Sequence, residues 1–225
     1  MTSLNLYGDE YRITSGTHGA DIASQRCDEL DQASIDFVAT KESCSVLDVG
    51  CGSGAQSVRF AHAGAKVVAV DIIDATELLD KALEELSLPA DSIKFVHNGI
   101  EPFLKDCTSK FDVIYSQRFI HYLHPSIAKA VVSRFHDILS SGGMVFISAS
   151  GMNSELSNGY SATKSDSIHR FDFLSDVMQE KHGIKEPVCL YYPEDLKRLF
   201  LEAGFIAKEV WESKFGNVKA IFIKP

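Results

Sequence analysis

The stretch VLDVGCGSGAQS, residues 46–57, places an aspartate at position 48 and glycines at positions 50, 52 and 54. Glycines at a turn allow positive φ angles, and they let a ligand approach the main chain because no Cβ stands in the way. Asp71 ends the next apolar run, KVVAVDI, where a carboxylate can accept hydrogen bonds from both hydroxyls of a ribose. The types and spacing of these residues predict a site for a cofactor that contains adenosine.

A second pattern suggests a different chemistry. Tyr160 and Lys164 form a Y-x-x-x-K sequence after an apolar run, which resembles the short-chain dehydrogenases. That family also has a first turn of the form T-G-x-x-x-G-x-G, and with Gly50 and Gly54 as its first glycines the third would stand at Gln56. An oxidoreductase that uses NAD(P) is therefore the alternative hypothesis and not the first one.

Strand and helix patterns alternate along the chain, as in βαβ units. Five strands linked through helices run mostly parallel, and the last two, joined by a tight turn at Gly216-Asn217, must be antiparallel. We expect strands at 45–50, 66–72, 92–98, 111–117, 142–150, 206–213 and 218–224, and helices at 19–40, 55–65, 75–86, 101–106, 125–140 and 193–204. The predicted fold is an α/β, Rossmann-like three-layer sandwich with a seven-stranded, mostly parallel sheet and a C-terminal antiparallel hairpin.

A chain of 225 residues with 45% hydrophobic and 24% charged residues has the size of one α/β domain. We expect a single domain over 1–225, divided into four parts. These parts are an N-terminal lid and helix (1–40), a cofactor-binding core (41–150), a substrate-lid insertion (151–190), and a terminal helix with the hairpin (191–225).

Composition excludes several classes of protein. A net charge of −9 disfavours a nucleic-acid partner, because such binding relies on Lys and Arg neutralising many phosphates. The N-terminus lacks an apolar signal region and no apolar run reaches membrane-spanning length, so we expect a cytoplasmic protein without a membrane partner. The five cysteines include no C-x-x-C pair, which indicates neither a disulfide framework nor a zinc site. We expect no metal.

The segments VLDVGCGSG, VVAVDI and FDVIYSQRFIHYL together resemble the class I S-adenosylmethionine-dependent methyltransferases over about residues 40–150 and the terminal hairpin. The resemblance implies that Asp48 anchors the amino end of the cofactor's methionine part. It also implies that Asp71 binds the ribose hydroxyls and that Ile72 lies against the adenine. The turn expected to pass under the methionine and the ribose comprises Gly50, Cys51, Gly52 and Gly54.

Beyond the third strand this sequence departs from the family pattern. The family often has an aspartate there that accepts from the adenine amino group, whereas VHNGIEPF offers Asn98, Gly99 and Ile100. We expect Asn98 or a backbone group near Ile100 to take its place. Ser116 and Gln117, at the end of the fourth strand, are expected to flank the methionine part.

Methyl transfer is a one-step displacement, so the implied enzyme acts mainly by positioning the acceptor, which would be an oxygen, nitrogen, sulfur or carbon atom of a small molecule. His121 and Tyr122 are the candidate catalytic residues, with His121 as a candidate general base. A packing or orienting role is the alternative for His121. A protein that binds the cofactor without transferring its methyl group is the alternative at the level of function.

Two segments outside the shared core are expected to select the substrate. In the N-terminal segment, Tyr7 or Tyr11 could contact the sulfonium through a cation-π interaction, and Arg12 or Arg26 could bind a carboxylate. The segment 151–190 is long for a connection, which is typical of a lid, and we expect its Tyr160 near the substrate mouth or on the surface. The sequence gives no prediction of the oligomeric state.

Overall fold

The computed structural model describes residues 17–19, 27–164 and 166–225. Its helices are α1 (Glu29–Ala39), α2 (Ala55–His62), α3 (Thr76–Glu85), α4 (Ile100–Asp106), α5 (Pro125–Ile138), α6 (Asp176–His182) and α7 (Pro193–Glu202). Its strands are β1 (Ser45–Val49), β2 (Lys66–Asp71), β3 (Ile93–His97), β4 (Phe111–Gln117), β5 (Leu139–Ala149), β6 (Ile206–Glu212) and β7 (Val218–Ile223). Within these ranges, no helix combines the length and the apolar character needed to cross a bilayer.

The strands form one sheet in the order β3-β2-β1-β4-β5-β7-β6. Strands β1 to β5 pair in parallel, and β7 pairs antiparallel with both β5 and β6. The predicted seven-stranded sheet with a terminal antiparallel hairpin is confirmed. Between β1 and β4 the chain reverses the direction in which it adds strands, and ligands of such sheets bind beside the carboxyl ends of the strands at that point.

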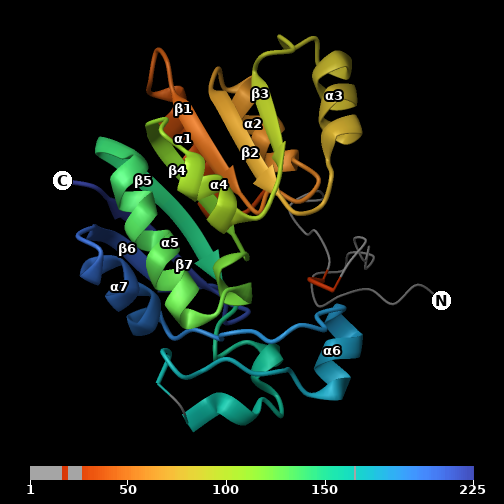
Figure 1. Cartoon of the computed structure of the whole chain (residues 1–225), viewed down its shortest axis with the longest axis vertical. Helices are drawn as coiled ribbons and strands as arrows, with labels where there is room; N and C mark the ends of the chain where they lie inside the picture. The colour runs from red at the N-terminus through yellow and green to blue at the C-terminus, as the bar shows by residue number, and fades with distance from the viewer. Residues whose placement is uncertain (1–16, 20–26, 165) are drawn as a thin grey trace.

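Helices cover both faces of the sheet and form a three-layer sandwich (Figure 1). On one face α1, α2 and α3 bury side chains such as Leu30, Phe60 and Leu79 against the sheet. On the other face α4, α5 and α7 contribute Leu104, Phe135 and Phe200. The central strand β1 is buried from both sides, which explains its nearly continuous apolar sequence SVLDV.

Helix α1 begins later than the sequence suggests. The prediction of a helix from Gly19 is wrong, because α1 starts at Glu29 behind a capping box. The Asp28 side chain accepts from the backbone N–H groups of Leu30 and Asp31, and the Asp31 side chain accepts from the Asp28 N–H at 2.7 Å. This reciprocal pair satisfies N–H groups that have no partner inside the helix, and so it fixes the first residue of the helix.

The insertion 151–190 has a small core of its own. It contains α6 and two short 3-10 helices, η2 (Glu155–Ser157) and η3 (Ser161–Lys164). In Figure 1 it lies beneath the sheet, at the end where the parallel strands finish. The buried side chains that form this core are Met152, Leu156, Tyr160, Leu174, Met178, Ile184, Val188 and Leu190. The insertion is therefore a packed substructure beside the crevice of the sheet.

Gly54 allows a test of how tightly α2 and α3 pack. Its φ is +82°, and a Cβ at this position would lie 2.3 Å from Leu79 Cδ2. We expect Gly54→Ala to lower the free energy of unfolding by about 2–4 kcal/mol, because backbone strain and overpacking act together. Urea unfolding of the purified protein measures this loss.

Gly64→Ala is the matched control. Gly64 has a similar φ of +92°, but a Cβ at this position would meet no atom of the described residues within 4 Å. Only the backbone strain applies there, so the expected cost is about 1–2 kcal/mol. Equal losses in the two variants would contradict the packing argument for Gly54.

Candidate functional site

A cavity of about 550 Å³ opens at the carboxyl ends of β1, β2, β3 and β4. Its volume lies in the range of about 300–1,000 Å³ that is usual for small-molecule sites. The cavity has two walls. The β1–β3 wall contains Asp48, Gly50, Cys51, Gly52, Ser53, Gln56, Val70, Asp71, Ile72, Ile73, Asp74, Ala75, Leu78, Asn98, Gly99, Ile100, Glu101 and Pro102. The β4 wall contains His18, Gly19, Arg118, Phe119, Tyr122, Leu123, His182 and Ile184, and Tyr115 and Gln117 lie between the walls.

The turn after β1 brings main chain directly to the cavity. Gly50 and Gly52 have φ angles of +68° and +56°, which residues with a Cβ adopt only with strain. The N–H of Gly50 donates to Val70 O at 2.9 Å, and a Cβ at Gly50 would lie 2.6 Å from the ring of Phe119. Gly50, Cys51 and Gly52 all line the cavity, where the sequence places them.

The carboxylate of Asp71 joins this turn to the end of β2. Its Oδ2 accepts from the N–H of Gly52 at 2.8 Å, and its Oδ1 accepts from the N–H of Ile73 at 2.9 Å. A carboxylate offers about four acceptor positions, so further hydrogen bonds to a ligand are possible. Ile72, which is 54% exposed, lines the cavity beside Asp71 and offers an apolar surface.

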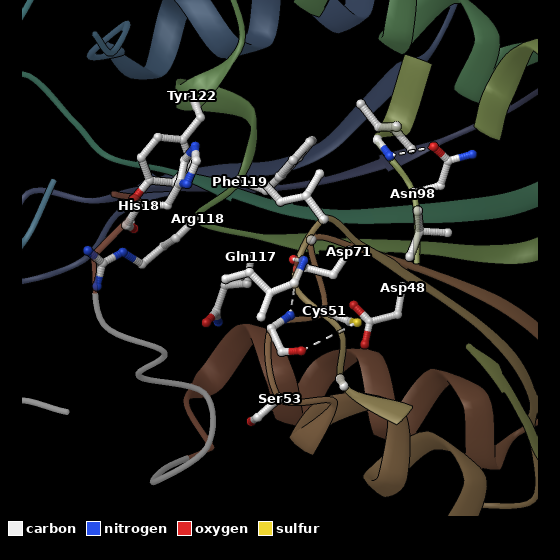
Figure 2. A pocket seen from close by; sticks show the side chains of 18 of the residues that line it. His18, Asp48, Cys51, Ser53, Asp71, Asn98, Gln117, Arg118, Phe119 and Tyr122 are labelled. Atoms are coloured by element: carbon white, nitrogen blue, oxygen red, sulfur yellow. Dashed lines mark hydrogen bonds between the residues drawn. The ribbon is translucent and has the colours of Figure 1, made fainter. Parts of the chain in front are cut away.

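Asp48 lies deeper, at the end of β1, where it is buried and lines the cavity. Its Oδ2 accepts from the Ser57 hydroxyl at 2.5 Å, which fixes the orientation of the carboxylate. Figure 2 shows Asp48 and Asp71 on the same side of the cavity. Two carboxylates there favour a ligand with hydroxyl groups or with a positive charge.

The loop after β3 contributes three of the predicted residues. Asn98, Gly99 and Ile100 all line the cavity. The Asn98 Oδ1 accepts from the N–H of Gly99 at 2.8 Å, and the Asn98 N–H donates to Asp71 O at 2.9 Å. These bonds hold the loop against the end of β2, so that the wall is continuous from the glycine turn to α4.

Gln117 connects the cavity to the start of α1. Its amide donates to Asp28 Oδ2 at 3.0 Å and to Asp31 Oδ1 at 2.7 Å, and the Tyr115 hydroxyl also donates to Asp31. Burial raises the pKa of Asp31, and burial together with the charge of Asp31 raises the pKa of Tyr115 well above its usual value. Lys219 pairs with Asp28 at 2.8 Å. This network fixes the position of α1 beside the cavity.

Two residues predicted for the cofactor site lie outside the cavity. Gly54 is the N-cap residue of α2 and lies against Leu79. Ser116 is fully buried and donates to Val49 O at 3.1 Å. Successive side chains of a strand point to opposite faces, so Gln117 faces the cavity and Ser116 does not. Neither residue lines the cavity, so their contact with a ligand stays a prediction that the structure does not favour.

The two candidate catalytic residues have different positions. His121 is 0% exposed and does not line the cavity; its ring nitrogens lie 3.2 and 3.4 Å from the hydroxyl and the N–H of Ser150. Burial lowers the pKa of His121 well below its usual value, and the charges of Arg118 and His18 add to this shift. The structure thus contradicts the prediction that His121 faces substrate as a general base, and favours the packing alternative.

Tyr122 does line the cavity, and its hydroxyl donates to the backbone oxygen of His18. Burial raises the pKa of Tyr122 to about 12, so this phenol stays protonated at neutral pH. The hydrogen bond fastens the segment 17–19 to the loop after β4. The Tyr122 ring also packs on that of His121, with 4.1 Å between the ring centroids.

Tyr160 is a core residue of the insertion. It is 3% exposed, it does not line the cavity, and its hydroxyl donates to Val188 O at 2.5 Å. The prediction of a mouth or surface position is wrong, because the insertion folds around this ring. The pattern that resembles a dehydrogenase therefore has its tyrosine away from the cavity. Tyr7, Tyr11, Arg12 and Arg26 lie outside the described residues.

Several residues of the β4 wall were not predicted from the sequence. Arg118 and Phe119 directly follow Gln117, so their position after a parallel strand was the signal that could have identified them. His18 and His182 come from distant segments that the fold brings together. The N–H of Gly19 donates to Gly183 O at 3.1 Å, and no local pattern in the sequence indicates this contact.

Comparison with known proteins identifies relatives. Residues 46–143 match the family model described as a methyltransferase domain. The ubiquinone biosynthesis O-methyltransferase of Actinobacillus pleuropneumoniae is 29% identical over 127 residues, which cover 53% of this chain and 53% of that protein. The chain spans about half the length of the curated relatives that it matches.

Two solved structures have the same fold. The 1,6-didemethyltoxoflavin-N1-methyltransferase of Burkholderia thailandensis, with bound 1,6-didemethyltoxoflavin and S-adenosylhomocysteine, has a TM-score of 0.63 at 18% identity over 87% of this chain and 78% of that one. The magnesium protoporphyrin IX methyltransferase of Synechocystis, with bound S-adenosylmethionine, has a TM-score of 0.59 at 15% identity over the same shares of the two chains. At these low sequence identities, the structural similarity establishes that the three chains share a fold.

The buried position of His121 predicts a pH dependence of stability. Its folded pKa is depressed, so the unfolded chain takes up a proton near the usual pKa of 6.5 while the folded protein does not. The contribution of the neutral His121 to the free energy of unfolding is fully present above pH 6.5 and is lost as the pH falls below that value. The expected loss is about 1 kcal/mol between pH 7 and pH 5.5. Urea unfolding at the two pH values measures it.

In His121→Asn the decrease in the free energy of unfolding between pH 7 and pH 5.5 should be smaller than in the wild type by about 1 kcal/mol. This holds whatever the stability of the variant at pH 7. His62→Asn, at an exposed position on α2, should keep the wild-type pH dependence. An unchanged pH dependence in His121→Asn would mean that His121 is charged in the folded protein.

Proposed function

We propose that this chain, which belongs to the class I S-adenosylmethionine-dependent methyltransferases, transfers the methyl group of S-adenosylmethionine to a small molecule. The relatives named above methylate oxygen in one case and the N1 nitrogen in another, according to their names. The proposal therefore specifies the methyl donor and a small-molecule acceptor, and it leaves the acceptor atom open among oxygen, nitrogen, sulfur and carbon.

The observation that carries the proposal is the pairing of Asp71 with the glycine turn. Asp71 holds the Gly52 N–H and still lines the cavity, so that backbone and carboxylate face the same space. A ribose needs hydrogen-bond acceptors for two adjacent hydroxyls, and a carboxylate supplies both. The absence of a Cβ at Gly50 and Gly52 leaves room for the rest of the cofactor to approach the main chain.

The other residues of the β1–β3 wall fit the remaining parts of S-adenosylmethionine. Asp48 would bind the amino group, because it is a fixed and buried carboxylate at the cavity. Ile72 and Ile100 would hold the adenine between apolar side chains, and Asn98 has an amide beside them. Gln117 would flank the methionine part. All of these groups are present without rearrangement of the described chain.

The β4 wall would hold the acceptor. Phe119, Leu123 and Ile184 exclude water from this half of the cavity, and Tyr122 closes it toward the segment 17–19. The chemistry that S-adenosylmethionine supplies is a methyl group on a positively charged sulfur. Holding an acceptor atom in line with that group can lower the barrier by about 7–11 kcal/mol through positioning.

Neither predicted catalytic residue acts as the base in this mechanism. His121 is separated from the cavity and stays neutral, and the Tyr122 phenol stays protonated. We propose that the chain catalyses by positioning and by excluding water, with an acceptor that is already ionised or has lost its proton to solvent before it binds. Tyr122 would then be a positioning residue.

Calorimetry separates this proposal from the oxidoreductase alternative. We expect S-adenosylmethionine and S-adenosylhomocysteine to bind and NADPH not to bind. Tight NADPH binding without binding of the sulfonium would contradict the proposal. A screen of small metabolites for transfer of a labelled methyl group then separates an enzyme from a protein that only binds the cofactor.

Asp71→Asn tests the carboxylate directly. The amide keeps one acceptor oxygen, so the bond to the turn can persist, but the second ribose hydroxyl loses its charged partner. We expect the affinity for S-adenosylhomocysteine to fall by about 10- to 100-fold, which corresponds to roughly 1.5–3 kcal/mol for a hydrogen bond to a charged group. Titration calorimetry measures this affinity.

Asp91→Asn is the control, because Asp91 is exposed, pairs with Lys66 at 2.7 Å and does not line the cavity. Its affinity for the cofactor should equal that of the wild type. An Asp71→Asn variant that binds S-adenosylhomocysteine as tightly as Asp91→Asn would show that the ribose lies elsewhere.

A further inference from the structure

The two walls of the cavity carry opposite charges. The β1–β3 wall contains the carboxylates of Asp48, Asp71, Asp74 and Glu101. Among the described residues that line the β4 wall, none is acidic, and Arg118 is the one Lys or Arg side chain. The whole chain has a net charge of −9, yet the β4 wall of its cavity carries a positive side chain and no carboxylate among the described residues.

Arg118 differs from the other arginines of the described chain, because the guanidinium of each of those donates to a side-chain oxygen within the described residues. Arg59 donates to Gln56 Oε1 at 3.0 Å. Arg134, Arg170 and Arg198 each pair with a carboxylate at 2.8 or 2.9 Å. Within residues 17–19, 27–164 and 166–225, no carboxylate lies within ion-pairing distance of the Arg118 guanidinium. A permanent positive charge that faces a cavity, with no counter-ion from the described part of the chain, is available for a negatively charged ligand.

The backbone places this side chain at a defined position. Arg118 has a φ of +54°, in the left-handed region that residues with a Cβ rarely adopt. Two hydrogen bonds from its N–H maintain the conformation, to Ser148 O at 3.1 Å and to Ser148 Oγ at 3.0 Å. Figure 2 shows that the side chain extends on the His18 side, away from Asp48 and Asp71.

The residues around Arg118 indicate the shape and polarity of the uncharged part of the ligand. Phe119, Leu123 and Ile184 are apolar members of the β4 wall, and Tyr122 adds a second aromatic ring. Such a surface suits a flat, mostly apolar molecule. His18 and His182 lie on the same wall, and neither adds a negative charge there.

We infer that the methyl acceptor is a small aromatic acid whose carboxylate binds the Arg118 guanidinium while its ring lies against Phe119 and Tyr122. This inference rests on the proposed function, since it assigns the β1–β3 wall to the cofactor. An arginine can form two parallel hydrogen bonds with a carboxylate, which fixes the direction of the ring as well as its distance. Arg118 would therefore select the acceptor and orient it.

S-adenosylmethionine also carries a carboxylate, so the test must distinguish the two sources of this group. The wild-type chain is first titrated with S-adenosylhomocysteine. The protein saturated with this product is then titrated with benzoate, 2-hydroxybenzoate, phenylacetate and indole-3-acetate, and with the primary amide of each acid. Because each amide keeps the ring and removes the charge, the ratio of the two affinities reports on the carboxylate alone.

We expect at least one acid to bind ten or more times tighter than its amide. In Arg118→Gln this preference should disappear while the affinity for S-adenosylhomocysteine stays within about twofold of the wild type. Arg118→Lys keeps the charge without the planar fork and should retain part of the preference. Lys94→Gln removes one exposed positive charge from β3, outside the cavity, and should behave as the wild type.

Three results would overturn the inference. The first is that no acid binds better than its amide to the saturated wild type, which includes the case in which none of the acids binds. The second is a loss of S-adenosylhomocysteine affinity of tenfold or more in Arg118→Gln, since Arg118 would then bind the cofactor's carboxylate. The third is an unchanged preference for acids in Arg118→Gln. A wild type that does not bind S-adenosylhomocysteine would instead refute the proposed function itself.

Discussion

The hydrogen bond from the Gly52 N–H to the Asp71 carboxylate, 2.8 Å long, joins the turn after β1 to the end of β2. Gly50 makes a parallel connection through Val70 O. Because these bonds hold the turn after β1, which borders the point between β1 and β4 where the order of strands reverses, they fix one side of the crevice that the sheet leaves open. The loop after β3 then attaches to the same place through the Asn98 N–H and Asp71 O. One side of the cavity is thus a continuous backbone surface with carboxylates facing inward.

The opposite side is built in another way. Three segments that are distant in the sequence, residues 17–19, 118–123 and 182–184, meet there, and each contributes lining residues. Backbone bonds between Gly19 and Gly183 and between Lys185 and Thr17 hold the first segment to the third, and the Tyr122 hydroxyl holds it to the second. A wall assembled from separate segments can change its side chains without disturbing the glycine turn, which is consistent with the acceptor site proposed for it.

Several polar residues near the cavity support its walls without facing it. His121 shares hydrogen bonds with Ser150 and packs under Tyr122. Asp31, buried among Tyr115 and Gln117, keeps α1 in place against the sheet. Burial shifts the pKa values of His121 and Asp31 toward their neutral forms, which is the usual consequence of removing an ionisable group from water. These residues carry the polar contacts on which the positions of Tyr122 and Gln117 depend.

The sequence by itself determined the alternation of strands and helices, the glycine turn, and the place of Asp48, Asp71 and Asn98 at strand ends. These features follow from local patterns, because a strand of period two must leave its last residues at the edge of the sheet. Only the tertiary structure decided which side chains near those ends face the cavity: Gln117 and Arg118 do, whereas Ser116, His121 and Tyr160 are buried. It also brought His18 and His182, which are distant in the sequence, to the same wall of the cavity. The physical reason is that burial and long-range contacts depend on how distant segments pack, and no local spacing of residues encodes that packing.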